Sequence, residues 1–327
     1  MKPLIRILCA LGLFAALGAP CADAQGLSRG ADPEGSLVQE LIVTARAPGP
    51  AWWEVSDADS TVWVMGLPAG LPKGTAWNER PMQDRLARAR SLLLPAQVRI
   101  GPLRALAFFI GHRKALRTSV PLEQGLPAPV ARRFAAARAS LGQPAKRYAA
   151  WKPAIAGVML DGDLRKATRL DAEQPLDRIR ALARKAHVGE RRVGTYDAGP
   201  VLTAVIAMSD EAQRECLDDA LAEVEAGPAR VSAAASGWAR GDVRAALAVE
   251  RGYDRCFAAL PVLSTLLQRG HADMANAIAG ALAQPGETVA MVDLRALLAT
   301  GGVLDQLRRR GFKVETPATV GNSSESR

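Results

Sequence analysis

Two strand-like segments lie near opposite ends of this 327-residue chain, and helical patterns fill most of the sequence between them. Residues 52–55 and 60–65 are rich in strand-forming side chains and predict a hairpin, and residues 289–294 form a short, mostly apolar run typical of a buried strand. Residues 102–187 and 201–283 carry mainly helical patterns, in which Gly227-Pro228 ends one helix, and residues 192–196 between these regions are strand-like. Helices around a few scattered strands predict one α+β domain, in which a small mixed sheet is surrounded by many helices.

The first 24 residues have the pattern of a secretory signal peptide. Lys2 and Arg6 precede an apolar run over residues 7–17, and Ala22-Asp23-Ala24 offers a small-x-small cleavage site. The apolar run is too short to span a bilayer, which needs about 20 residues. Pro20, directly before Cys21, argues against a lipid anchor. We therefore expect export, cleavage after residue 24, and a periplasmic or secreted protein.

Composition divides the remaining chain into three parts. Residues 25–50 contain Gly, Pro and acidic residues, which predicts a flexible N-terminal segment, and the apolar patch over residues 37–43 could alternatively form a short strand. Residues 51–316 are expected to form a single domain, and the polar residues 317–327 a disordered tail.

After signal cleavage the chain retains two cysteines, Cys216 and Cys256. Two cysteines in an oxidising compartment are candidates for a disulfide, and the alternative is a pair of buried thiols that pack as small hydrophobic groups. Neither has a histidine or a second cysteine at zinc-ligand spacing. We therefore predict a disulfide and no metal or other cofactor.

The chain carries a formal net charge of +9. Such a charge suits an anionic partner, either a membrane surface, an acidic polysaccharide or nucleic acid. An exported chain with 5% aromatic residues and no recognisable binding motif argues against nucleic acid. The basic residues are also spread along the sequence, apart from Arg308-Arg309-Arg310 at the end of an expected helix, where cations favour the helix dipole.

Several short motifs occur in a characteristic order along residues 50–316. They are Trp53-Glu54-Val55, Trp63-Val64-Met65-Gly66, Trp238-Ala239-Arg240-Gly241-Asp242, Gly301-Gly302-Val303-Leu304 and Gly311-Phe312-Lys313-Val314. In this order and spacing they resemble the TraB/GumN family. The resemblance implies the fold of that family and, for active members, metal-dependent hydrolysis at a site where the two terminal strands converge.

The resemblance also implies that the site residues of the family are missing. Family members place Gly-x-x-His at the ends of both strands, and Ala69 and Ala296 stand at the two histidine positions. Pro95 stands where a third strand normally runs into a glutamate. A methyl group can neither bind a metal nor move a proton. We therefore expect a degenerate pocket formed by Gly66, Ala69, Pro95, Asp293 and Ala296.

Few polar residues remain as candidates for that pocket. Arg269 matches a residue that the family retains, and Asp197 stands near a family acid. The three histidines His112, His187 and His271 are not paired with one another at ligand spacing, which predicts surface or helix-end positions.

These observations lead to three functional hypotheses. The first is an exported, catalytically inactive family member that acts as a binding or accessory protein of the cell envelope, with an envelope protein or polysaccharide as its partner. The alternative is a metal-dependent hydrolase with a relocated site that uses Asp197, Asp293 and a distant histidine. The third is a structural envelope protein without a pocket.

Overall fold

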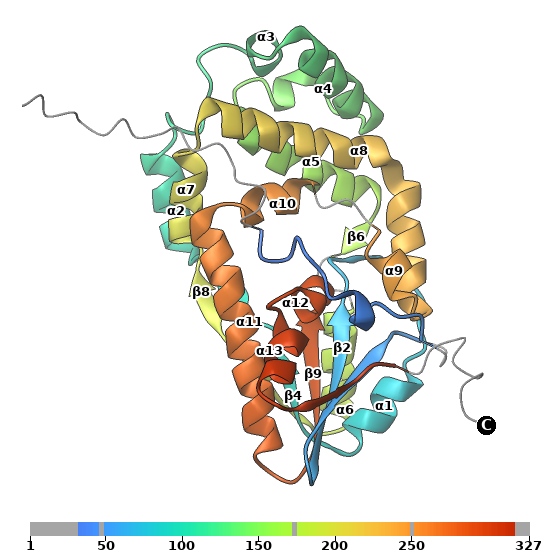
Figure 1. Ribbon diagram of the computed structural model, residues 1–327. Helices are drawn as coiled ribbons and strands as arrows, with labels where there is room; N and C mark the ends of the chain where they lie inside the picture. The colour runs from blue at the N-terminus through green and yellow to red at the C-terminus, as the bar shows by residue number, and fades with distance from the viewer. Residues whose placement is uncertain (1–31, 46–48, 172–174, 249–251, 318–327) are drawn as a thin grey trace, which may run out of the picture.

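The computed structural model describes residues 32–45, 49–171, 175–248 and 252–317. Residues 1–24, the expected signal peptide, and residues 318–327 lie outside these ranges, so the predictions made for them are not addressed by the structure. Figure 1 shows a sheet in one half of the molecule and a group of helices in the other. The α+β prediction is confirmed.

The main sheet has six strands in the order β10-β1-β2-β9-β4-β7. Their bounds are Lys313–Glu315 for β10, Trp52–Ser56 for β1, Ser60–Leu67 for β2, Gly286–Asp293 for β9, Ala89–Leu94 for β4 and Gly189–Arg192 for β7. Strands β2, β9, β4 and β7 run parallel, whereas β1 pairs antiparallel with both β2 and β10. The central strand β9 therefore comes from the end of the chain and lies between strands from its beginning.

Strand periodicity places alternate side chains of β9 on opposite faces of the sheet. Ala290 and Val292 pack with helices α11 (Pro261–Leu282), α12 (Leu294–Leu298) and α13 (Val303–Arg309). Val289 and Met291 pack with α1 (Arg80–Leu86) and α6 (Leu176–Lys185). Helices thus cover both faces, which explains why residues 289–292 are almost continuously apolar.

A second group of helices packs beyond one end of the sheet (Figure 1). It comprises α3 (Leu122–Gly125), α4 (Ala128–Ser140), α5 (Pro153–Ala167), α7 (Gly199–Ile206), α8 (Asp210–Ala239) and α10 (Gly252–Ala258). The longest, α8, is interrupted at Gly227, which has a φ of 76°, and Pro228 starts its second half. The expected break at Gly227-Pro228 is therefore present, and a new helical segment begins there because proline is well tolerated in a first helical turn.

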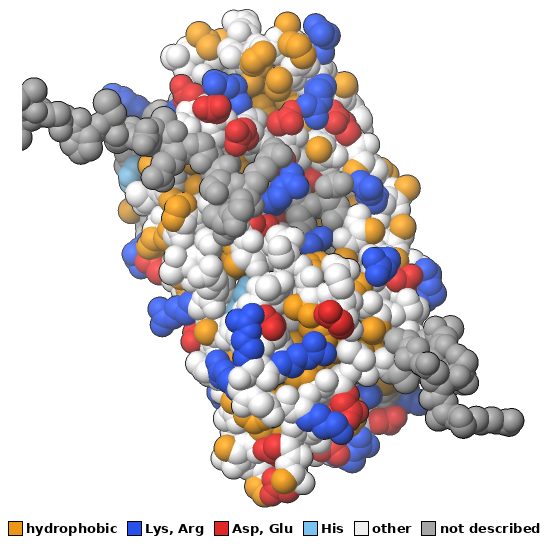
Figure 2. All heavy atoms as spheres, viewed as in Figure 1, with side chains coloured by type: hydrophobic (Ala, Val, Ile, Leu, Met, Phe, Trp, Pro, Cys, Tyr) orange, Lys and Arg blue, Asp and Glu red, His pale blue; other side chains and the backbone are white. Residues whose placement is uncertain are grey.

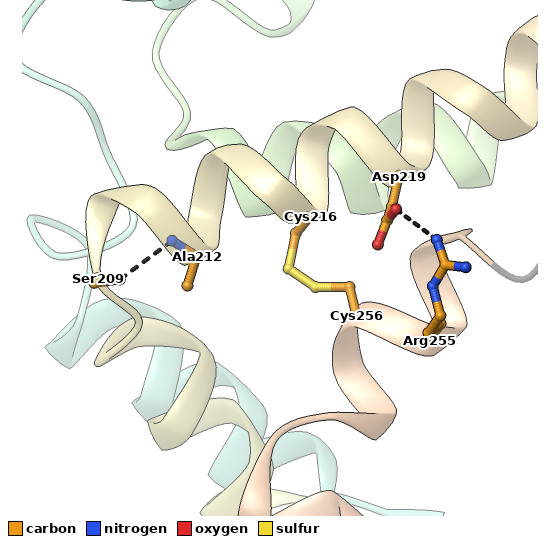
Figure 3. The surroundings of a disulfide bond; sticks show 6 residues. All are labelled: Ser209, Ala212, Cys216, Asp219, Arg255 and Cys256. Carbon is orange, nitrogen blue, oxygen red and sulfur yellow. Dashed lines mark hydrogen bonds and ion pairs between the residues drawn. A yellow bond between two sulfur atoms is a disulfide. The ribbon is translucent and has the colours of Figure 1, made fainter. Parts of the chain in front are cut away.

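A disulfide joins Cys216 on α8 to Cys256 on α10, with 5.4 Å between the two Cα atoms. Both residues are almost fully buried. Figure 3 shows the bridge next to an ion pair between Arg255 and Asp219, whose Nη2 and Oδ1 atoms are 2.8 Å apart. The predicted disulfide is confirmed, and it ties α10 to the first half of α8.

The short elements connect these two halves. They are β3 (Leu71–Pro72) paired with β6 (Leu170–Asp171), β5 (Gln97–Arg99) paired with β8 (Thr195–Asp197), α2 (Pro102–Gly111), α9 (Val243–Ala246) and the 3₁₀ helices Gln39–Leu41 and Ala145–Arg147. The strand expected over residues 192–196 is divided between β7 and β8, which belong to different sheets.

Residues 32–45 of the N-terminal segment pack against the rest of the fold. Leu37 forms an isolated β-bridge with Ala299, and Thr44 forms one with Asp242. Leu41 is fully buried in the core between the sheet and α11–α13. Its apolar residues supply the packing energy that a composition rich in Gly and Pro does not reveal.

Charged residues are distributed over the surface. On the face drawn in Figure 2, acidic and basic side chains are interspersed. Among the described residues, none of the helices is long and apolar enough to cross a membrane.

Candidate functional site

Three neighbouring parallel strands end at the same edge of the sheet. Leu67 ends β2 and pairs in register with Asp293, which ends β9, and Pro95 follows directly after β4. The carboxyl edge of a parallel sheet is where open α/β sheets usually bind ligands, because loops from adjacent strands surround one crevice there.

A cavity of about 600 Å³ lies between this edge and the helical half of the molecule. Ala69 and Gly70 line it from the loop after β2, and Asp293 and Arg295 from the end of β9 and the start of α12. The opposite wall comes from α5, α7, α8, α10 and α11. Most of this wall is apolar, with residues such as Val158, Leu202, Val205, Val231, Phe257, Leu263 and Leu267, and it also carries the charged residues Asp161, Arg165, Glu223, Arg230 and Asp254. A large, mainly apolar cavity with a few polar groups is typical of a small-molecule site.

A smaller cavity of about 80 Å³ adjoins the large one. Pro95, Ala296 and Tyr196 line it, and Glu34 and Asp293 line both cavities. Ala69 therefore faces the large cavity, whereas Pro95 and Ala296 face the small one. Gly66 lines neither of them and lies instead against Trp238 and Leu294.

A histidine and two carboxylates meet where the two cavities join. His271 on α11 is only 4% exposed, and its Nε2 atom lies 3.5 Å from Oε1 of Glu34. This corrects the expected surface or helix-end position of His271, whereas His112 follows α2 and the exposed His187 follows α6. His271 shares one helix face with Met274, Ala275 and Ile278, and that periodicity was a signal of burial.

Asp293 has a perturbed pKa at this junction. Its side chain is accessible from the two cavities that it lines, and it is surrounded by protein rather than bulk water. Burial raises the pKa of Asp293 from 3.8 to about 6, repulsion from Glu34 adds to the rise, and His271 opposes it. The junction therefore changes its charge close to neutral pH.

The raised pKa of Asp293 predicts a pH-dependent effect of Asp293→Asn on stability. Between about pH 4 and pH 6 the folded protein binds more protons at Asp293 than the unfolded chain, so the free energy of unfolding falls as the pH rises through this window. The variant has no charge to bury. We expect it to melt above the wild type at pH 7 and to lose this advantage below about pH 4 in thermal melts across that range. A difference in melting temperature between the two proteins that does not change with pH would contradict the raised pKa of Asp293.

Within the described residues, no three His, Cys, Asp or Glu side chains are grouped so that they could hold a metal ion.

The sequence profile of the TraB/PrgY/gumN family matches residues 51–316. The chain belongs to this family. No curated protein and no solved structure matches it.

Two motifs shared with the TraB/PrgY/gumN family have structural roles next to the cavity. Trp238 donates a hydrogen bond from Nε1 to the carbonyl oxygen of Gly66, at 2.8 Å, and lies edge-on to Trp77. A Cβ atom at Gly66 would lie 2.4 Å from Cδ1 of Leu294, so the start of α12 packs directly on this glycine. Asp242 caps α9 by accepting a hydrogen bond from the backbone N–H of Ala245.

The two other polar candidates lie outside the cavity lining. Arg269 is 67% exposed, forms a 3.7 Å ion pair with Asp273 and lies over the ring of Tyr196. It contacts the small cavity only through this ring. A hydrogen bond from the backbone N–H of Gly199, together with a 2.9 Å ion pair with Arg104, holds the pKa of Asp197 below its usual range. Neither residue reaches the junction formed by Glu34, His271 and Asp293.

Sequence reasoning missed Glu34 and His271. Glu34 belongs to a segment that precedes the first strand by many residues, and nothing in its local pattern indicates that it folds back onto the sheet edge. Only the tertiary fold brings it to His271.

Proposed function

We propose that this member of the TraB/PrgY/gumN family is an exported, catalytically inactive binding protein that holds a small ligand at the carboxyl edge of its sheet. One observation carries the proposal. The cavity at the strand ends is large, whereas the three positions that the family resemblance assigns to ligands carry Ala69, Pro95 and Ala296. An open site without these donors favours binding over metal-dependent hydrolysis.

The residues present do not fit the metal of active relatives. A divalent metal needs three or more donors, and the side chains of Ala69, Pro95 and Ala296 contain only carbon. The nearby Glu34, His271 and Asp293 do not form a group that could hold an ion. We therefore assign no step to a metal.

Export is supported by the N-terminal pattern and by the disulfide. Cys216 and Cys256 form a bridge of the kind that persists in oxidising compartments. A periplasmic or secreted location follows as part of the proposal, together with a partner or ligand from the cell envelope.

The cavity favours a mainly apolar ligand with a cationic or hydrogen-bond-donating end. Apolar side chains from α5, α7, α8 and α11 would pack against the body of such a ligand. Asp293 lies at the junction of the two cavities and is ionised above about pH 6, so it would accept hydrogen bonds from the polar end.

Calorimetric titration with decylamine, decanol and decanoate tests this proposal. These probes share one apolar chain and differ in charge. We expect decylamine to bind most tightly at pH 7.5, because its ammonium group faces Asp293. Asp293→Asn should remove the preference for the amine, and Ala69→Trp should weaken all three by filling the cavity. Ala128→Trp, an exposed site on α4 outside the cavity lining, is the matched control.

Two results would overturn the proposal. The first is that Ala69→Trp binds each of the three probes as tightly as the wild type does. The second is one equivalent of tightly held zinc, manganese or cobalt in protein purified without a histidine tag, measured by elemental analysis.

A hydrolase with a relocated site is the second candidate, and the contact between His271 and Glu34 favours it. A buried histidine beside two carboxylates is an arrangement that can move protons in catalysis. A screen of ester and peptide substrates separates the candidates. Turnover that is lost in both His271→Gln and Asp293→Asn would establish this second function in place of the first.

A further inference from the structure

Helix α2 exposes an apolar surface that the fold does not cover. None of its residues is buried. The most exposed large side chains are Leu103 at 81%, Ile110 at 68%, Leu106 at 57% and Phe109 at 52%. Single exposed apolar residues are ordinary, but a contiguous group marks an interaction site.

These side chains share one side of the helix. At 100° per residue, Leu103, Leu106 and Ile110 fall within about 60° of each other, and Phe109 extends the same stripe. Phe108 points elsewhere, because its ring stacks on His112 with 4.4 Å between the ring centres. The stripe therefore faces outward, and α2 lies at the edge of the molecule (Figure 1).

Cations flank this stripe at both ends. Arg99 precedes α2, and Arg113, Lys114 and Arg117 follow it. All four are exposed, and residues 99–117 contain no Asp or Glu. Arg104 within the helix pairs with Asp197 from β8. The region thus combines an apolar ridge with a local excess of positive charge.

We propose that α2 and its flanking cations bind the surface of an anionic lipid bilayer. Apolar side chains would enter the boundary between head groups and acyl chains, while the cations remain at the lipid phosphates. Charge complementarity selects this occupant over a second copy of the chain. Two copies that met through α2 would bring the same cations together with no acid in residues 99–117 to pair with them. The inference does not depend on the ligand in the cavity.

Co-sedimentation with lipid vesicles of the protein with its disulfide formed tests the proposed membrane-binding surface of α2. One set contains phosphatidylcholine alone and the other phosphatidylcholine with phosphatidylglycerol. We expect binding to the mixed vesicles that weakens with added salt. Each cation near an anionic surface contributes about 1 kcal/mol to the free energy of binding. Replacing two of them, as in Arg113→Gln with Lys114→Gln, should therefore lower the affinity for the mixed vesicles roughly thirty-fold. Leu103→Ser with Ile110→Ser should lower it at least tenfold without removing charge.

The matched control is Arg309→Gln with Arg310→Gln, which removes two exposed cations at the end of α13. It should bind nearly as well as the wild type, and circular dichroism checks that every variant is folded. Equal losses in both charge variants would mean that net charge alone drives binding, and the proposal would then be wrong. Absence of binding to the mixed vesicles, or a dimer in analytical ultracentrifugation that Leu103→Ser with Ile110→Ser dissociates, would also overturn it.

Discussion

Loss of the Cys216–Cys256 disulfide is expected to lower the free energy of unfolding by about 4 kcal/mol. The bridge spans 40 residues, and the chain-entropy relation gives this value for a loop of that size. For a domain of this length, the same change corresponds to a fall of roughly 10 °C in the melting temperature. Both cysteines are buried between α8, α10 and their neighbours, so the native fold also loses packing when the bridge opens.

Differential scanning calorimetry of wild type and Cys216→Ser with Cys256→Ser measures this effect. Reductant should bring the wild type down to the melting temperature of the double variant and leave the variant unchanged. Two reactive thiols in the unreduced wild type, titrated in denaturant, would contradict the assignment.

Replacement of Trp238 by alanine should cost about 3–5 kcal/mol, the usual cost of truncating a buried aromatic side chain. Trp238 is 3% exposed and packs against Trp77 and the core on the α1 side of the sheet. It also donates a hydrogen bond to Gly66, in the strand that leads to the cavity. Removing the side chain therefore opens a hole and leaves a buried carbonyl oxygen without its partner.

Trp238→Phe is the matched control, because it keeps an aromatic ring in the core while it removes the donor and the rest of the indole. We expect a smaller loss of about 1–3 kcal/mol, measured with the alanine variant by chemical denaturation. A phenylalanine variant as unstable as the alanine variant would assign the effect to the hydrogen bond rather than to packing.

The elements that could be predicted from sequence are those with strong local signals. Periodicity located β2 and β9, and Gly227 with its following proline marked the interruption of α8. The disulfide followed from the number of cysteines and the export signal. Each of these signals depends on residues close together in sequence, or on composition.

The candidate site was harder to predict because its polar residues come from distant segments. Glu34, His271 and Asp293 are brought together only when residues 32–45 fold onto the sheet edge. Arg269 illustrates the opposite case. A position matched to the family suggested a pocket role, but the side chain points to solvent and pairs with Asp273 one turn further along α11.

The position of β9 has a consequence for the order of folding. This strand lies between β2 and β4 and pairs with both, yet it begins at Gly286. The helices α3 to α8 can pack through contacts that are much closer in sequence, whereas the sheet must wait until nearly all of the chain has emerged. A chain that is truncated before β9 would leave β2 and β4 with unpaired edges, which are prone to aggregation. In the export that we propose, a chain kept extended until its last segment has crossed the membrane would avoid this exposed intermediate.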